Sequence, residues 1–271
     1  MLDCDFLGDG QAINRNMSIE KTVGVVAGAG PFAGLDLMAK ILEQTSARKD
    51  QDHLAIVSLS LPAAIPDRTE FLLDRSAVNP AHAIVEQLLL LEKMGAHVAG
   101  IPCNSAHAAA IFDEVLSQLK DAGCRIMVLH MVKEVLRHLQ TYYPHVSRVG
   151  VLSTIGTYRA RLYPQLLEPA GIHVVTLDPE FQEQMIHPAI YDPVYGIKSC
   201  GAATEWATER LLAGGHILQE RGAQAVILGC TEIPLAIRER TVAGMIVIDP
   251  TLILARALVE VANPKKLKPW I

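Results

Sequence analysis

Two of the five cysteines, Cys103 and Cys230, occupy equivalent places in the chain. Each follows a short apolar run and precedes a polar pair, Asn104–Ser105 in the first case and Thr231–Glu232 in the second. Two thiols on opposite sides of a carbon atom can invert its configuration, because one thiolate removes a proton while the other thiol donates one. The pattern favours proton transfer at a stereocentre.

The other three cysteines, Cys4, Cys124 and Cys200, show no such arrangement, and we expect them to be packing residues. The number of cysteines is odd, and no two of them are spaced as C-x-x-C. A disulfide scaffold and a zinc ribbon are therefore not expected. Free thiols are typical of the reducing cytoplasm, which is the compartment we predict.

A helix that starts after each cysteine would lower the pKa of its thiol. Asn, Ser and Thr are common helix caps, so we expect the two polar pairs to begin such helices. Glu232 either assists Cys230 or lies in a first helical turn for dipole reasons alone. Backbone N–H groups of the loops at 28–31 and 153–157 are candidates to stabilise a carbanion intermediate.

Short β-branched runs alternate with amphipathic segments along the chain. The predicted strands are 22–27, 54–59, 97–101, 126–129, 148–152, 172–177, 224–228 and 245–248. The predicted helices are 34–45, 80–94, 105–121, 131–140, 158–169, 199–220 and 251–261. This alternation predicts an α/β fold with parallel sheets and right-handed crossovers.

The second half of the chain repeats the first. VGVVAGAG at Val23 resembles VGVLSTIG at Val149, an offset of 126, and MGAHVAGIPCNS at Met94 aligns with RGAQAVILGCTE at Arg221, an offset of 127. The offsets predict an internal duplication, hence two pseudo-symmetric lobes, each with a mainly parallel four-stranded sheet flanked by helices. Ligands bind at the carboxyl ends of such strands, so the two thiols should face each other between the lobes. The expected divisions are a flexible tail at 1–18, lobe 1 at 19–127 plus 250–271, and lobe 2 at 128–249.

The bulk properties exclude several classes of partner. The net charge of −5 argues against nucleic acid or an anionic membrane. No apolar run approaches the roughly 18 residues of a membrane span. Residues 1–17 are acidic and lack the order of a signal peptide.

The glycine-rich loop after the first strand fits a G-x-G-x-x-A dinucleotide fingerprint over residues 28–33. The acidic residue expected at the end of the second strand is missing, since the sequence at 58–60 is Ser-Leu-Ser. Pro31 also removes one backbone donor. Gly28 and Gly30 are therefore better suited to a small carboxylate than to a nicotinamide cofactor.

Several motifs together resemble the aspartate/glutamate racemase superfamily, most closely its aspartate racemase branch. They are VAGAGPFAG (26–34), DQDH (50–53), PDRT (66–69), PCNSAH (102–107), STIGTY (153–158), YGIKSC (195–200), GCTEIPL (229–235) and VIDP (247–250). The resemblance implies a two-lobed α/β fold with the site between the lobes, no cofactor, a small amino-acid substrate and a homodimer.

The resemblance also assigns roles to residues. Cys103 and Cys230 become the catalytic pair, and Arg68, together with Lys198, holds the distal carboxylate. The remaining substrate-binding positions are Gly28, Gly30, Asn104, Ser105, Ser153, Thr154, Thr157, Thr231 and Glu232. Arg68 suits this role because a guanidinium offers a planar fork for a carboxylate.

Two departures from the family pattern bear on specificity. Ala29 stands where the family usually has methionine, which opens space near the substrate, and Ser105 replaces the usual threonine but keeps the hydroxyl.

The favoured reaction is cofactor-independent racemisation of aspartate or glutamate. The alternatives are a broad-specificity amino-acid or hydantoin racemase, a maleate isomerase, a malonate-type decarboxylase and a non-catalytic carboxylate-binding protein. His107 has metal-compatible spacing from Cys103, but no second cluster accompanies it, so no metal is expected.

Overall fold

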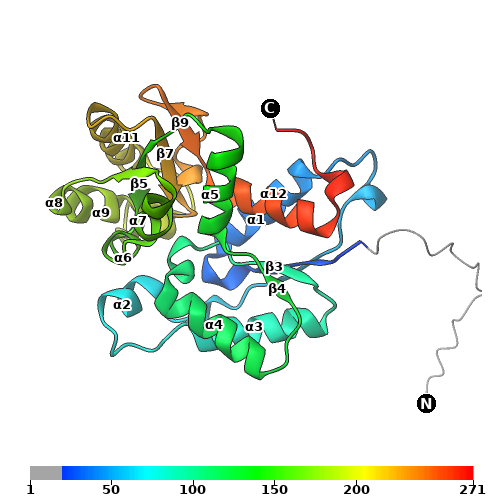
Figure 1. Cartoon of the computed structure of the whole chain (residues 1–271). Helices are drawn as coiled ribbons and strands as arrows, with labels where there is room; N and C mark the ends of the chain where they lie inside the picture. Colours follow the sequence, from blue (N-terminus) through cyan, green and yellow to red (C-terminus); the bar gives the residue numbers. More distant parts are fainter. Residues whose placement is uncertain (1–19, 271) are drawn as a thin grey trace, which may run out of the picture.

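The structure, a computed structural model, describes residues 20–270. It contains two sheets that follow one another in the sequence (Figure 1). The strands of the first sheet, in spatial order, are β2 (Ile56–Leu59), β1 (Val23–Val26), β3 (Val98–Gly100) and β4 (Met127–Val128). Those of the second are β6 (His173–Val175), β5 (Arg148–Ser153), β7 (Ala225–Gly229), β9 (Met245–Ile248) and β8 (Thr241–Val242).

The two sheets share one topology. In the first sheet β1 pairs in parallel with β2 and β3, and β3 pairs in parallel with β4. In the second sheet β5 pairs in parallel with β6 and β7, and β7 pairs in parallel with β9. This is the arrangement that the repeated sequence segments predict. The second sheet carries one strand more than predicted, because β8 pairs antiparallel with β9 at the edge.

Helices cover both faces of each sheet (Figure 1). In the first lobe α1 (Pro31–Gln44) and α12 (Pro250–Ala262) lie on one face, and α3 (Ala81–Lys93) and α4 (Ala109–Asp121) lie on the other. In the second lobe α5 (Met131–Tyr142) and α7 (Leu162–Leu167) oppose α9 (His187–Tyr191) and α11 (Glu205–Glu220). Strands covered on both faces need apolar residues at successive positions, which explains their continuous apolar runs.

The remaining helical segments are short and lie in the connections. They are α2 (Arg68–Leu73), α6 (Ile155–Arg159), α8 (Pro179–Phe181), a π-helical turn (Gln182–Ile186) and α10 (Ile197–Cys200). Single 3-10 turns occupy Ala27–Ala29, Asp50–Asp52, Pro62–Ala64, Asn104–His107, Glu168–Ala170, Ile233–Leu235 and Pro264–Lys266. Several of these segments border the carboxyl ends of the strands.

Cys200 is exposed at the end of α10, with its thiol directed to the carbonyl of Val194, so its assignment as a packing residue is wrong. The predicted tail at 1–18, with Cys4, lies outside the described residues.

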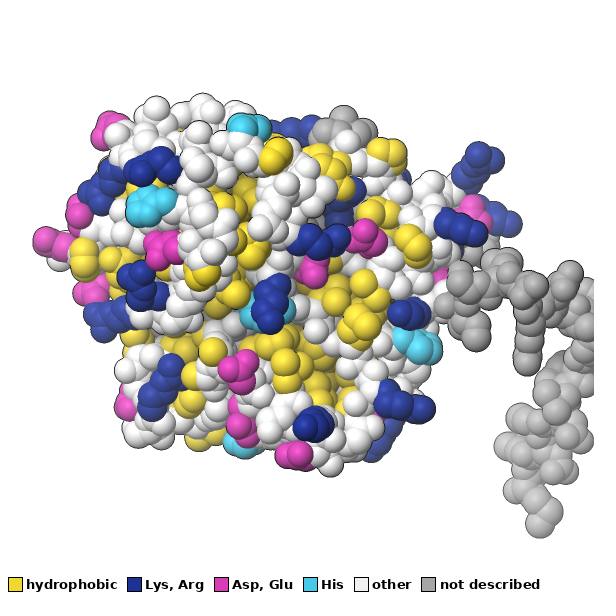
Figure 2. Space-filling model, in the orientation of Figure 1, with side chains coloured by type: hydrophobic (Ala, Val, Ile, Leu, Met, Phe, Trp, Pro, Cys, Tyr) yellow, Lys and Arg dark blue, Asp and Glu magenta, His cyan; other side chains and the backbone are white. Residues whose placement is uncertain are grey.

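Among the helices over residues 20–270, none is long and apolar enough to span a membrane. Basic and acidic side chains are interspersed on the face drawn in Figure 2.

Candidate active site

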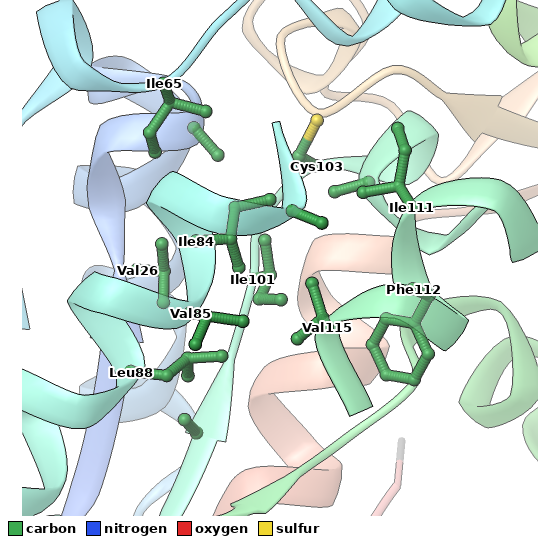
Figure 3. Close-up of a cluster of buried hydrophobic side chains, with 14 of the residues drawn as sticks. Val26, Ile65, Ile84, Val85, Leu88, Ile101, Cys103, Ile111, Phe112 and Val115 are labelled. Atoms are coloured by element: carbon green, nitrogen blue, oxygen red, sulfur yellow. The ribbon is translucent and has the colours of Figure 1, made fainter. Parts of the chain in front are cut away.

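The two cysteines lie at corresponding strand ends of the two sheets. Cys103 follows β3 and Cys230 follows β7 directly, and the two residues are 7% and 6% exposed. The Thr231 hydroxyl donates to the carbonyl of Pro102 at 3.1 Å, which joins the loop of one cysteine to that of the other. In Figure 3 the Cys103 sulfur points away from the apolar cluster around Ile101. Both thiols are therefore available to one shared space.

That space is a small chamber, here called the inner chamber. Its volume is about 10 Å³. The residues that line it are Arg68, Cys103, Asn104, Ser105, Thr154, Thr157, Tyr191, Lys198, Gly229, Cys230, Thr231 and Glu232. A volume of this size holds about one water molecule. A ligand larger than water must therefore displace some of these side chains.

The expectation that an α-helix starts right after each cysteine is wrong. A 3-10 turn follows in each case, Asn104–His107 and Ile233–Leu235, and no side chain caps either turn. In the first lobe α4 begins only at Ala109. The polar pairs are instead turned into the inner chamber, where their side chains can contact a ligand.

Cys230 is held as a neutral thiol by its neighbours. Its Sγ donates to Glu232 Oε2 at 2.9 Å. Burial raises the pKa of the Cys230 thiol well above its ordinary value, and the Glu232 carboxylate adds to this more than Lys198 opposes it. The lowered pKa expected of this cysteine is therefore wrong. Burial alone would raise the pKa of Glu232, but Lys198 and the bond from Cys230 lower it, so the carboxylate is ionised.

Cys103 has a cation as its neighbour. Its Sγ lies 3.4 Å from Ser105 Oγ. Burial opposes the charge on the guanidinium of Arg68, but the Cys103 thiol and the nearby Tyr191 and Asp67 raise the pKa of this group. The two cysteines thus have opposite electrostatic surroundings, a carboxylate beside one and a guanidinium beside the other.

Arg68 is fixed by backbone contacts at the start of α2. Its Nη2 donates to the carbonyl of Ala29 at 2.6 Å and its Nη1 to that of Pro66 at 3.2 Å. Asp67 caps the helix, accepting from the N–H of Glu70 at 2.8 Å. Arg68 Nε is buried and has no partner among the described residues. The Arg68 guanidinium therefore has an N–H group that is still free to donate to a ligand.

Lys198 forms an ion pair with Glu232 Oε1. Burial would lower the pKa of Lys198, but Glu232 and Cys230 raise it, so the ammonium is charged. Glu232 also lies against the first loop, because a Cβ at Gly30 would come within 3.0 Å of Glu232 Oε1. A side chain at position 30 would therefore require Glu232 to shift by a few tenths of an ångström.

A second and larger space, the outer chamber, adjoins the first and has a volume of about 270 Å³. Its lining residues are Gly28, Ala29, Gly30, Pro31, Phe32, Pro62, Asp67, Arg68, Lys198 and Glu232. The two chambers share only Arg68, Lys198 and Glu232. These three side chains form the partition between them. Gly28 and Gly30 thus lie outside the chamber that holds the thiols.

The hydroxyl-rich loop of the second lobe contributes two of its three predicted residues. Thr154 caps α6 and is hydrogen-bonded to Thr157 at 3.3 Å between the two hydroxyls, and both residues line the inner chamber. Ser153 lines neither chamber, since its hydroxyl is directed to the carbonyl of Thr154. The prediction that Ser153 contacts substrate is therefore not supported.

Sequence reasoning missed Tyr191 and Tyr163. The Tyr191 hydroxyl donates to Asp67 Oδ2 at 3.0 Å, and its ring lies 5.4 Å from Lys198 Nζ. The Tyr163 hydroxyl donates to Asn104 Oδ1 at 2.5 Å. Neither tyrosine lies within a motif next to a cysteine, so only their spatial positions reveal them.

His107 is fully buried, and burial lowers its pKa to about 3. Its Nε2 pairs with the carbonyl of Ile101 at 3.1 Å, and its ring packs 4.9 Å from that of Phe112. A buried neutral imidazole with these partners has a structural role. Over residues 20–270 no group of three His, Cys, Asp or Glu side chains is placed to hold a metal.

A model of the Asp/Glu/hydantoin racemase family matches residues 26–258, which include both cysteine loops. The chain belongs to this family. The broad specificity amino-acid racemase RacX of Bacillus subtilis (strain 168) is 26% identical over 163 residues, covering 58% of this chain and 64% of that protein. The glutamate racemase of Pseudomonas aeruginosa (strain UCBPP-PA14) is 30% identical over 184 residues, covering 66% and 62%. The chain thus matches slightly less than two thirds of the length of these two relatives.

Solved structures of the family share the fold over most of the chain. The aspartate racemase of Picrophilus torridus has a TM-score of 0.74 and 28% identity, covering 90% of this chain and 94% of that one. The glutamate racemase of Francisella tularensis subsp. tularensis SCHU S4, in complex with D-glutamate, has a TM-score of 0.64 and 16% identity, covering 93% and 85%. At that lower identity the similarity concerns the fold alone.

Proposed function

We propose that this racemase-family protein interconverts the enantiomers of an acidic amino acid, aspartate or glutamate, through proton transfer by Cys103 and Cys230. The observation that carries the proposal is the pair of thiols from equivalent strand ends that line one chamber. A substrate Cα between them has a thiol on each face. Inversion needs this arrangement, because the proton must leave from one face and arrive on the other.

The surroundings of the thiols support an assignment of roles in the resting enzyme. The guanidinium of Arg68 is placed to balance a thiolate at Cys103, whereas the Cys230 thiol donates to Glu232. Cys103 then removes the α-proton and becomes a thiol, while Cys230 gives its own proton to the opposite face of Cα and becomes a thiolate. The reverse reaction exchanges these roles. When it starts from the resting enzyme, Glu232 can accept the Cys230 proton and Cys103 takes up a proton from solvent.

The polar lining supplies partners for two carboxylates. Asn104, Ser105 and Thr157 offer an amide and hydroxyls near the thiols, where an α-carboxylate would lie. Arg68 and Lys198, at the partition, offer two cations for the side-chain carboxylate. Donors fixed around an α-carboxylate also stabilise the negative charge that spreads onto it when the α-proton leaves.

Substrate binding requires the partition to rearrange. The inner chamber has room for about one water molecule, and its wall toward the outer chamber includes the Lys198–Glu232 ion pair. An incoming carboxylate can replace Glu232 as the partner of Lys198, because it supplies the same charge. The closed site thereby favours anionic substrates over neutral ones.

The outer chamber favours a second candidate, a racemase of broader amino-acid specificity. Beyond the partition its wall is formed mainly by Gly28, Ala29, Gly30, Pro31 and Phe32, which carry no charge. A side chain longer than that of glutamate could extend into this space. The similarity to RacX, a broad specificity amino-acid racemase, supports this second candidate.

The test is to incubate each enantiomer of aspartate, glutamate and a panel of neutral and basic amino acids with the protein in D₂O. Circular dichroism follows inversion, and NMR follows α-deuteration. We expect inversion and deuteration of aspartate or glutamate in particular. Exchange restricted to longer side chains would select the second candidate. Absence of exchange on every amino acid would contradict both, and a maleate or arylmalonate assay would then be the next step.

A further inference from the structure

The buried hydrogen bond between Tyr163 and Asn104 has no part in the scheme above. Tyr163 lies on α7 in the second lobe, and Asn104 follows Cys103 in the first. The tyrosine hydroxyl donates to Asn104 Oδ1 at 2.5 Å, and the two residues are only 1% and 2% exposed. A hydrogen bond from which water is excluded holds its partners firmly, because no solvent competes for them.

The other end of the same amide has no partner. Asn104 Nδ2 is buried, and no described residue accepts a hydrogen bond from it. Asn104 also lines the inner chamber beside Cys103. Buried amide donors are normally paired, so an unpaired one at the wall of a binding chamber is suited to an acceptor that arrives with the ligand.

The tyrosine decides which end of the amide faces the ligand. With Oδ1 taken by the Tyr163 hydroxyl, the chamber side of Asn104 presents an N–H donor. The flipped amide would present its oxygen to the chamber and leave the tyrosine proton without an acceptor. Burial keeps that proton in place, since it raises the pKa of Tyr163 well above its ordinary value. The Asn104 amide therefore presents its N–H donor to the chamber, which suits a carboxylate ligand.

We infer that Tyr163 is a positioning residue, which holds the Asn104 amide with Nδ2 directed at the α-carboxylate of the substrate. The identity of that carboxylate rests on the proposed function, whereas the orientation of the amide does not. Since the two residues belong to different lobes, the same bond also sets the α-carboxylate site of one lobe against α7 of the other.

The kinetic test is a double-mutant cycle of Tyr163→Phe and Asn104→Ala. A hydrogen bond to a charged group corresponds to roughly 10- to 100-fold in binding or rate, so each single variant should lose that much in kcat/KM. If Tyr163 acts through Asn104, adding Tyr163→Phe to Asn104→Ala should change kcat/KM less than twofold. Losses that multiply in the double variant would overturn the inference.

The matched control is Tyr158→Phe. The Tyr158 hydroxyl donates to the carbonyl of Leu177 at 3.2 Å in the same lobe, and Tyr158 lines neither chamber. This substitution also deletes one tyrosine hydroxyl and its hydrogen bond. We expect kcat/KM within twofold of the wild type. A loss as large as that of Tyr163→Phe would show a general structural effect and contradict a positioning role.

A binding test does not require racemisation. The chain has five asparagines, so ¹⁵N-asparagine labelling with Asn104→Ala as the reference identifies the Asn104 side-chain signal by NMR. Addition of succinate, a dicarboxylate without an amino group, should shift this signal in the wild type and not in Tyr163→Phe. An unshifted signal in saturated wild type would overturn the inference. Shifts without any amino-acid racemisation would preserve it and reject the proposed function.

A third variant covers the case in which Tyr163→Phe does not fold. Asn104→Asp keeps an oxygen to accept the Tyr163 hydroxyl but puts a second oxygen where Nδ2 was. We expect its succinate Kd to rise at least 10-fold, measured by calorimetry, with a thermal midpoint close to that of the wild type. Succinate binding equal to the wild type would contradict the donor role of Nδ2.

Discussion

Cys103 and Cys230 differ in their surroundings although their places in the two lobes correspond. The guanidinium of Arg68 adjoins the first thiol, and the carboxylate of Glu232 accepts from the second at 2.9 Å. A thiolate is favoured beside a cation and disfavoured beside an anion in a buried site. The two thiols therefore have different electrostatic surroundings in the resting enzyme, although the reaction itself is reversible.

Serine in place of either cysteine should abolish inversion. A serine hydroxyl stays protonated at neutral pH and is a weak base, so neither Cys103→Ser nor Cys230→Ser retains both members of the acid–base pair. We expect each variant to lose at least about a thousandfold in kcat, measured by circular dichroism. Cys124→Ser, a half-buried thiol outside the chambers, is the control and should retain wild-type activity. Full activity in either of the two catalytic variants would contradict the assignment.

The raised pKa of Cys230 predicts a loss of stability at alkaline pH. In the unfolded chain this thiol ionises near its ordinary pKa of 9.0, whereas burial and Glu232 keep it protonated in the folded protein. Its contribution is fully present below that pH. Above it unfolding releases a proton, so the free energy of unfolding falls by up to about 1.4 kcal/mol per pH unit.

This pH dependence can be assigned with two variants. Urea unfolding between pH 8 and 10.5 should show a shallower decline for Cys230→Ser than for the wild type. Cys200→Ser, which removes an exposed thiol, should decline like the wild type. Equal declines in all three proteins would show that Cys230 is not the group responsible.

Glu232→Gln should separate binding from catalysis. The amide no longer competes with the substrate carboxylate for Lys198, so KM should fall a few-fold. The Cys230 thiol meanwhile loses its anionic hydrogen-bond acceptor, which should lower kcat by roughly 10- to 100-fold. Initial rates over a range of substrate concentrations give both values. A raised KM would contradict the claim that Glu232 competes with the substrate for Lys198. An unchanged kcat would contradict the part of Glu232 in the proton transfer.

At the scale of elements, the short helix α10 carries the lysine of the partition. Gly201 follows the helix as its C-cap with a φ of +63°, in the left-handed region, and a Cβ there would come within 2.3 Å of the Phe32 ring. Phe32 lines the outer chamber at the start of α1. The position of Lys198 is thus tied to the first loop through this contact.

Gly201→Ala should displace α10 and weaken substrate binding. The left-handed backbone costs an alanine about 1 kcal/mol, and the Phe32 ring must also move. Gly171→Ala is the matched control, because Gly171 has a φ of +83° but open space around it. Both variants should lose stability in urea unfolding, but only Gly201→Ala should raise KM, by several-fold. An equal KM in both would show that the Phe32 contact does not position Lys198.

The strands could be predicted from the sequence, whereas much of the site could not. Runs such as Val23–Val26 and Ala225–Gly229 are apolar at successive positions because helices cover both faces of each sheet. The 3-10 turns after the cysteines were predicted as α-helices, since Asn104 and Thr231 are of types that cap helices but here face the chamber instead. Local helix propensity cannot show that a side chain must face a chamber formed by segments far away in the sequence.

The predicted residues differ in how far their positions support a role. Arg68 and Lys198 were placed by resemblance, and both line the inner chamber. Tyr163 could not be found, because its partner Asn104 is 59 residues away and in the other lobe. Ser153 was included only as part of a hydroxyl-rich loop; its hydroxyl donates to the carbonyl of Thr154, and the residue lines neither chamber. Pairwise geometry between lobes is the information that a single sequence lacks.

At the scale of the whole molecule, the two lobes are joined where β9 leads into α12. Asp249 at this crossover caps α12 and accepts from Lys40 on α1 at 2.6 Å, while Asp36 accepts from the same ammonium at 2.5 Å. The side chains of Lys40, Asp36 and Asp249 are 13%, 21% and 16% exposed. One largely buried cation thus balances two carboxylates and joins α1 to the start of α12.

Lys40→Met should destabilise the fold without removing a group from either chamber. Two half-buried carboxylates lose their shared cation, so we expect the free energy of unfolding to fall by about 2 kcal/mol. Arg137→Met is the control, because Arg137 also joins two carboxylates, of Glu134 and Glu260, but is 54% exposed. It should lose less than about 1 kcal/mol. Equal losses in urea unfolding would show that burial of the Lys40 ion pairs is unimportant.

The central claim is that two opposed thiols divide the proton transfer between them, and early-time isotope distribution tests it most directly. One enantiomer of the preferred substrate is incubated in D₂O, and the α-deuterium content of product and of unreacted substrate is measured during the first few per cent of conversion. We predict that the product carries deuterium in every molecule while the remaining substrate retains its protium, because the new proton comes from a second, solvent-exchanged thiol. Protium transferred into the product, or substrate that gains deuterium as fast as product forms, would contradict the account.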